Sequence, residues 1–122
     1  MSSIAISPHR MPEVPAYAAM RALNSADISL DSISVMEINE AFAAVPLVST
    51  LLLAGKDTQK AKAVREKTNV NGSAIAVGHP NTASGARLIM NLMYELQRRG
   101  GGYALGAICG GLAQADACII KV

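Results

Sequence analysis

The sequence predicts an α/β domain with a five-stranded mixed sheet and helices on both faces of that sheet. Three observations lead to this prediction. Short apolar runs that suit strands alternate with longer segments of helical periodicity along the 122 residues. The helical segment 41–54 is apolar nearly all the way round, and 83–99 has apolar residues on two faces, so each should be buried on more than one side. The last two strand-like runs are joined by only a few residues, which favours an antiparallel pair.

The N-terminal third of the sequence predicts a strand, a helix and a second strand. Ile4-Ala-Ile6 is the first strand, which ends before Pro8. Pro12 suits the first turn of a helix that extends to about Leu23. Ser34-Val-Met-Glu-Ile38 is the second strand, so this part of the chain predicts a βαβ unit.

The middle of the chain carries two helices and a third strand. Asn39 follows the second strand and is well placed to cap the apolar helix over 41–54. The charged residues between Lys56 and Lys67 predict a solvated surface helix. The short apolar run that ends at Gly78 is then the third strand, and it completes the central part of the sheet.

A turn and a long helix follow the third strand. In Gly78-His79-Pro80 the proline biases the histidine away from helical geometry, and a hydroxyl at Thr82 or Ser84 can cap the helix over 83–99. His79 is therefore held at a strand-to-helix corner, beside unpaired backbone N–H groups that favour negative charge. That position suits acid–base chemistry or oxyanion stabilisation.

Two strands complete the chain after the glycines at 100–102, which end the long helix. They cover 103–108 and 115–122, and the link between them begins at Cys109. This cysteine and Cys118 have no metal-ligand spacing, and a disulfide between them would be unusual in a reducing compartment. We expect two free thiols and no metal site.

Composition and charge exclude several classes of function. Hydrophobic residues make up 51% of the chain and charged residues 16%, which excludes a disordered tail. The net charge of +2 is scattered, and one Phe, three Tyr and no Trp leave little aromatic surface for stacking bases or for a membrane belt. No apolar run is long enough to span a bilayer, and the start at Met1 lacks the features of a signal peptide. We expect a cytoplasmic chain that binds neither nucleic acid nor membrane.

Three polar side chains follow consecutive predicted strands. Asn39 comes after the second, His79 after the third and Cys109 after the fourth. Because side chains at the carboxyl ends of strands converge on one crevice in open α/β sheets, they could share acid–base and oxyanion roles. Gly110 and Gly111 would let a substrate approach the backbone closely. Each residue also has a purely structural interpretation, as a helix cap, a histidine bonded to backbone, or a core thiol.

Four motifs together resemble the C-terminal catalytic half of the thiolases, in the family's order and over essentially the whole chain. They are Asn39-Glu-Ala-Phe42, Asn69-Val-Asn-Gly72, Gly78-His-Pro80 with Ser84-Gly-Ala-Arg87, and Cys109-Gly-Gly111. Each motif is short and weak by itself, but the set is specific. The resemblance implies a thiolase-like C-terminal half, with residues 1–122 forming a single domain and the N-terminal half absent.

The resemblance implies a role for each motif residue. His79 resembles the histidine that activates the nucleophilic cysteine and contributes to an oxyanion hole, in which Asn39 holds a water. Cys109 resembles the acid–base cysteine. Gly111 resembles the donor of the other oxyanion hole. Phe42 resembles a residue that lines the acyl pocket, and Gly110 is placed with it as a substrate contact.

The resemblance also implies a reaction and a partner. The reaction is reversible Claisen condensation or thiolysis of 3-ketoacyl-CoA, with coenzyme A thioesters as substrates and no separate cofactor. The family's acylated cysteine belongs to the missing half. We therefore expect this chain to be inactive alone, and to be completed by an N-terminal thiolase half or within a homo-oligomer.

The sequence departs from the family pattern in the pocket. Asn81 and Thr82 stand where the family usually has an apolar residue and a glycine, which bears on the acyl preference. Two alternatives therefore stay open. One is a ketoacyl-synthase-like condensing enzyme, although such enzymes commonly use two histidines and only His9 accompanies His79. The other is a non-catalytic acyl-CoA-binding or assembly subunit of the same fold.

Overall fold

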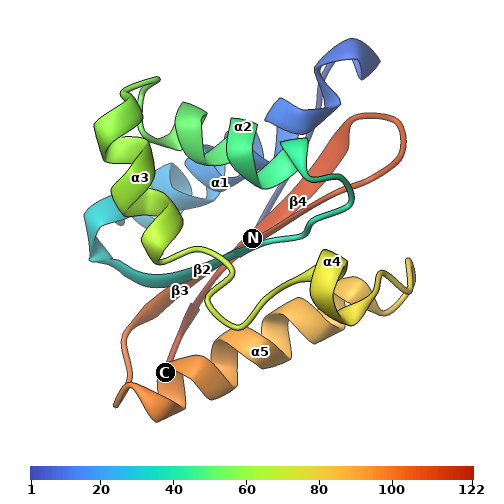
Figure 1. Cartoon of the computed structure of the whole chain (residues 1–122). Coiled ribbons are helices and arrows are strands. Elements are labelled where there is room, and N and C mark those ends of the chain that lie inside the picture. The colour runs from blue at the N-terminus through green and yellow to red at the C-terminus, as the bar shows by residue number, and fades with distance from the viewer.

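A computed structural model describes all residues from Met1 to Val122, and its centre is a mixed sheet of four strands (Figure 1). The strands are β1 (Ser2–Ala5), β2 (Ile33–Ile38), β3 (Tyr103–Cys109) and β4 (Gln114–Lys121), in the spatial order β1-β4-β3-β2. β2 and β3 are parallel, whereas β4 is antiparallel to both β3 and β1. The predicted antiparallel pair at the C-terminal end is confirmed.

The predicted third strand is wrong, so the sheet has four strands instead of five. The apolar run before Gly78 forms a short helix, α4 (Ala74–Val77), in which Ile75 and Val77 are exposed. The free edge of β2 is instead occupied by the chain at Thr68, which forms an isolated bridge to Met36. The Asn69 side chain continues this pairing.

Asn69 takes the place that a strand would have beside the end of β2. Its Oδ1 accepts from the Ile38 N–H at 2.9 Å, and its Nδ2 donates to the Ile38 carbonyl at 3.0 Å. Its own backbone has φ of 54°, a left-handed conformation that asparagine tolerates, and the chain turns away from the sheet. Both polar groups of Ile38 are thus satisfied without a fifth strand.

Three helices cover one face of the sheet (Figure 1): α1 (Val14–Ala26), α2 (Ala44–Leu53) and α3 (Thr58–Glu66). A core cluster of 16 buried residues joins them to the sheet. Small side chains on α1, such as Ala18, Ala19 and Ala22, are buried in this cluster. α3 is the predicted surface helix, and Asp57 caps it by accepting from the Gln59 and Lys60 N–H groups. Short 3₁₀ helices, η1 (Pro8–Glu13) and η2 (Leu30–Ser32), precede α1 and β2.

The opposite face is covered by α5 (Ser84–Arg98), which confirms helices on both sides of the sheet. Leu88, Leu92 and Leu96 form a second, smaller core cluster with residues of β2 and β3. Gly106 allows this approach, because a Cβ there would lie 2.4 Å from Leu88 Cδ2. Neither hydroxyl predicted to cap α5 does so: the helix starts after Ala83 without a side-chain cap.

The outer face of α5 carries exposed apolar side chains. Ile89, Met90, Met93 and Tyr94 are all exposed, and Tyr94 has 70% of its surface accessible. The prediction that this helix has apolar residues on two sides is therefore confirmed, and the sheet covers only the leucine stripe. None of the helices is long and apolar enough to cross a membrane.

Candidate active site

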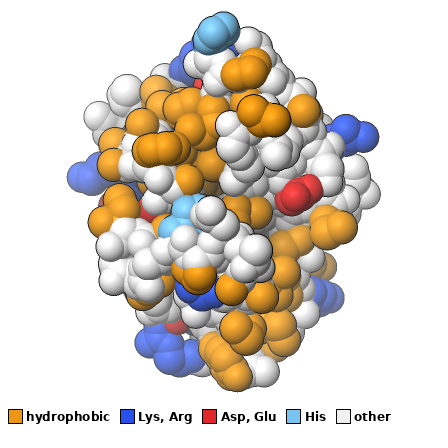
Figure 2. Space-filling view, turned by 90° about the vertical axis from the view of Figure 1, so that its right-hand side faces the viewer, with side chains coloured by type: hydrophobic (Ala, Val, Ile, Leu, Met, Phe, Trp, Pro, Cys, Tyr) orange, Lys and Arg blue, Asp and Glu red, His pale blue; other side chains and the backbone are white.

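A cavity of about 610 Å³ lies at the carboxyl end of β3 and gathers most of the residues that the sequence singled out. His79, Cys109, Gly110, Gly111 and Phe42 all line it. The remaining lining residues are Pro8, Met11, Ala41, Asn81 and Ile108. Figure 2 views the molecule from the side on which the β3–β4 turn and α4 lie in Figure 1, and hydrophobic side chains gather over much of this face with a histidine among them. Asn39 does not line the cavity, but its side-chain amide contacts the His79 ring.

His79 is held by the turn that leads into α5, although it follows a helix and not the predicted strand. Its Nδ1 lies 2.6 Å from Ser84 Oγ, and that hydroxyl donates to the Pro80 carbonyl at 3.2 Å. Because the single hydroxyl proton is used there, Ser84 accepts from His79 and Nδ1 carries the imidazole proton. Nε2 is then the basic nitrogen of the neutral ring.

Asn39 is fully buried and fixes the other side of the imidazole. Its Nδ2 lies 3.3 Å from His79 Nε2, a long contact that a ligand could replace. Its Oδ1 accepts from Arg87 at 3.0 Å, so the amide nitrogen must face the histidine. The prediction that Asn39 caps a helix is wrong, because α2 begins only at Ala44.

A buried charge pair beneath Asn39 holds this arrangement. Arg87 donates to Glu37 at 2.5 Å, and Ser73 Oγ donates to the same carboxylate oxygen at 3.2 Å. Burial raises the pKa of Glu37, and the Arg87 guanidinium opposes that rise. The hydrogen bonds thus run from Glu37 through Arg87 and Asn39 to His79.

Sequence reasoning missed Glu37, Ser73 and the roles of Arg87 and Ser84. One signal was available for Glu37, which is an acidic residue inside an otherwise apolar strand. A buried carboxylate of this kind needs a cationic partner. No local pattern could identify that partner as Arg87, which lies 50 residues further along the chain.

Cys109 is the last residue of β3, half-buried at the cavity wall. Burial raises the pKa of its thiol, and a backbone hydrogen bond offsets this only in part. The group is therefore a neutral thiol near pH 7, suited to giving up a proton more than to acting as a ready thiolate. Cys118 is also a free thiol, but it lies on β4 beside a different cavity, between α5 and the sheet.

The two glycines that follow Cys109 have different surroundings. A Cβ at Gly110 would lie 2.5 Å from the Gln114 side-chain nitrogen, so a larger residue there would displace the Gln114 side chain. Gln114 in turn braces the turn by accepting from the Leu112 N–H at 2.9 Å. Gly111 has open space where a Cβ would be, and its N–H has no partner within the chain. Of the two, only Gly111 leaves backbone open to a ligand.

The cavity thus offers a basic imidazole nitrogen, a neutral thiol and a free backbone N–H. This set can move protons and stabilise a developing oxyanion in one cavity. No group of three or more His, Cys, Asp or Glu side chains lies close enough together to hold a metal ion.

The whole chain, residues 1–122, matches the family model described as "Thiolase, C-terminal domain". The probable acetyl-CoA acetyltransferase of Mycolicibacterium smegmatis is 48% identical over 107 residues, which are 88% of this chain and 26% of that protein. The β-ketoadipyl-CoA thiolase of Acinetobacter baylyi is 41% identical over 120 residues, or 98% of this chain and 28% of that protein.

A solved structure of a thiolase also matches nearly the whole chain. The crystal structure of human mitochondrial 3-ketoacyl-CoA thiolase superimposes with a TM-score of 0.87 at 41% identity, covering 98% of this chain and 28% of that one. The chain therefore spans about a quarter of the length of the curated relatives that it matches.

Proposed function

Since this chain belongs to the thiolase family, as a match to its C-terminal domain, we propose that it is the C-terminal half or small subunit of a thiolase. It would transfer acyl groups between acyl-CoA and CoA, by Claisen condensation in one direction and by thiolysis of 3-ketoacyl-CoA in the other. One observation carries the proposal: His79, Cys109 and Gly111 line a single cavity.

The proposed roles follow from the state of each group. In thiolysis, Nε2 of His79 takes the thiol proton of the nucleophilic cysteine, which belongs to the other half. The resulting thiolate then adds to the 3-keto carbon. The bond between C2 and C3 breaks, and the acetyl-CoA enolate takes a proton from Cys109. A thiol that burial keeps protonated is suited to this donation. CoA then attacks the acyl-cysteine, the thiol proton of CoA returns to Cys109, and the released cysteine takes back the proton held by His79. In condensation the Cys109 thiolate removes the α-proton.

Oxyanion stabilisation is assigned to two positions. The free N–H of Gly111 would donate to the thioester oxygen at one site. His79 and a water held by Asn39 would form the other, because the Arg87 bond turns the Asn39 amide nitrogen toward this side. Phe42 and Gly110 would contact the acyl group.

The covalent nucleophile must come from outside this chain. Cys109 is the only thiol that lines the cavity, and Cys118 lies beside another one. We therefore propose a complement that supplies the nucleophilic cysteine, either an N-terminal thiolase half or a second chain. Coenzyme A thioesters are the substrates, and no separate cofactor takes part.

The test is an assay of acetoacetyl-CoA with CoA, using this chain alone and together with an N-terminal thiolase half. We expect turnover only in the combination. There, His79→Ala and Cys109→Ala should each cost several orders of magnitude, whereas Asn39→Ala should cost about a hundredfold, as for one oxyanion-hole contributor. Cys118→Ala is the matched control and should keep near-normal activity. Turnover by the chain alone, abolished by Cys109→Ser, would make Cys109 the nucleophile.

A second candidate is an acyl-CoA-binding subunit without catalysis. The single thiol of the cavity favours it, as does Asn81, a polar residue that lines the cavity where the family usually has an apolar one. Such a subunit would bind CoA thioesters in the completed assembly while Cys109→Ala left the rate of thiolysis unchanged. The same set of variants therefore separates the two functions.

A further inference from the structure

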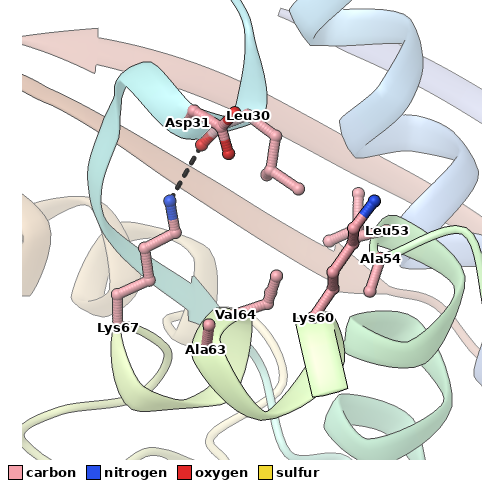
Figure 3. Close-up of a pocket in the computed structure, with 8 residues that line it drawn as sticks. All are labelled: Leu30, Asp31, Leu53, Ala54, Lys60, Ala63, Val64 and Lys67. Atoms are coloured by element: carbon pink, nitrogen blue, oxygen red, sulfur yellow. Dashed lines mark hydrogen bonds between the residues drawn. The ribbon is translucent and has the colours of Figure 1, made fainter. Parts of the chain in front are cut away.

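A second large cavity lies away from the candidate active site, between α3, the end of α2 and η2 (Figure 3). Its volume is about 570 Å³. Leu30, Leu53, Ala54 and Val64 give it an apolar lining. Lys67 stands at its side and reaches toward the Leu30–Asp31 segment, as Figure 3 shows.

Two backbone carbonyls fix the Lys67 amine. Nζ donates to the Leu30 carbonyl at 2.9 Å and to the Ile33 carbonyl at 2.8 Å, and no third protein group accepts from it. An ammonium has three N–H groups, whereas a neutral amine has two and a lone pair. The neutral amine therefore keeps both hydrogen bonds, and its lone pair takes the one position that the protein leaves unoccupied.

The surroundings favour that neutral form. Burial lowers the pKa of Lys67, and the Asp31 carboxylate opposes this only in part. The other charged group that lines the cavity is Lys60, whose positive charge adds no stabilisation to a second cation. A lysine whose pKa is lowered by burial and whose amine lies beside an apolar cavity has the properties of a nucleophile.

We propose that Lys67 is an acylation site, whose amine accepts the acyl group of a thioester with its chain lying in the apolar cavity. Nζ attacks the thioester carbonyl, a C–N amide bond forms, and the C–S bond breaks. The thiolate that leaves takes up the proton that Nζ loses. No oxidant, reductant or further reactant is needed.

Acylation would change the junction between α3 and β2. The amide nitrogen retains one hydrogen, so it can keep only one of the two bonds to Leu30 and Ile33. The positive charge is also lost. This site goes beyond the proposed thiolase reaction and uses none of its residues.

The test uses the whole chain and two small thioesters, S-acetyl- and S-octanoyl-N-acetylcysteamine. These reagents lack the nucleotide of CoA, so the outcome does not depend on thiolase activity. Peptide mass spectrometry follows acylation at pH 7.5 of Lys67 and of Lys62, an exposed lysine on the same helix that serves as the internal control. We expect Lys67 to react severalfold faster than Lys62, because burial lowers the pKa of Lys67 and the apolar cavity beside it can hold the acyl chain. The ratio of octanoyl to acetyl rates should also be larger at Lys67.

Two variants make the test specific. Ala63→Leu adds volume at an exposed position that lines the cavity, and should lower octanoylation of Lys67 without affecting Lys62. Lys67→Arg keeps the charge and should remove only the signal at this position. Rates at Lys67 equal to or below those at Lys62, or the same octanoyl preference at both lysines, would overturn the proposal and leave Lys67 as a structural anchor.

Discussion

At the scale of single residues, the tautomer of His79 is determined by hydrogen bonds that need no substrate. Ser84 accepts from Nδ1 because its own proton goes to the Pro80 carbonyl, and Asn39 faces Nε2 because Arg87 binds its oxygen. The basic nitrogen of the imidazole is thereby specified within the isolated chain, before any partner is added.

Ser84→Ala should therefore change the tautomer of His79. Without an acceptor at Nδ1, only the long contact from Asn39 Nδ2 to Nε2 still favours this tautomer, and the loss of about 1 kcal/mol for one hydrogen bond is enough to shift the population severalfold. The measurement is the pattern of ¹⁵N chemical shifts of the imidazole in the isolated chain, with the exposed His9 as internal control.

Ser84→Thr keeps the hydroxyl and should retain the pattern of the original protein. An unchanged His79 spectrum in Ser84→Ala would mean that Ser84 does not set the tautomer.

At the scale of elements, the C-terminal end of α5 depends on a buried carboxylate. Glu95 accepts from Arg98 in the last turn of α5, from Arg99 directly after it, and from Asn71 in the segment before α4. These groups, led by Arg98, lower the pKa of Glu95 from 4.5 to about 2. The charged carboxylate thus links the last turns of α5 to a segment more than twenty residues away.

The stability of the chain should depend on pH through Glu95. Because the pKa is lower in the folded state, the unfolded state binds more protons, so the contribution is present above about pH 4.5 and is lost as the pH falls toward 2. Urea unfolding at several pH values should show this decline, and Glu95→Gln should be less stable at neutral pH but show a shallower decline.

Glu66→Gln, at an exposed position on α3 without an ion pair, is the matched control for this prediction. It should leave the pH dependence as it is. If the free energy of unfolding of Glu95→Gln fell with pH as steeply as that of the original chain, the acid sensitivity would come from other carboxylates.

At the scale of the whole molecule, the exposed outer face of α5 leads us to predict that the chain associates. Met90, Met93 and Tyr94 are exposed on a helix whose other face is already packed, and Ile75 is exposed on the neighbouring α4. Clustered apolar side chains of this kind mark interaction sites in folded proteins. The complement proposed above is one candidate to cover this face.

We expect the isolated chain to self-associate at high micromolar concentration, and Met90→Lys with Tyr94→Lys to reduce this association. Sedimentation equilibrium is the measurement. Gln97→Lys adds a charge to an exposed residue of the same helix and should change association much less. A monomeric original chain that binds no apolar dye would show that this face needs no partner.

Much of the architecture follows from sequence patterns alone. The periodicity of 83–99 predicts a helix with apolar residues on two sides, although it does not decide which side packs on the sheet, and the short link after Cys109 predicts an antiparallel pair. The four motifs predict the family, which the match over residues 1–122 confirms. Each of these properties is determined by residues close together in the chain, so a local pattern is sufficient to reveal it.

Only the tertiary structure decided the features that depend on distant partners. The apolar run before Gly78 is as suited to a strand as to a helix, and it forms α4 because Asn69 already satisfies the end of β2. Asn39 is followed by a helical pattern, yet its amide is used by His79 and Arg87 and caps nothing. Periodicity records which face of a segment is apolar, whereas hydrogen bonds between residues tens of positions apart depend on how the elements pack.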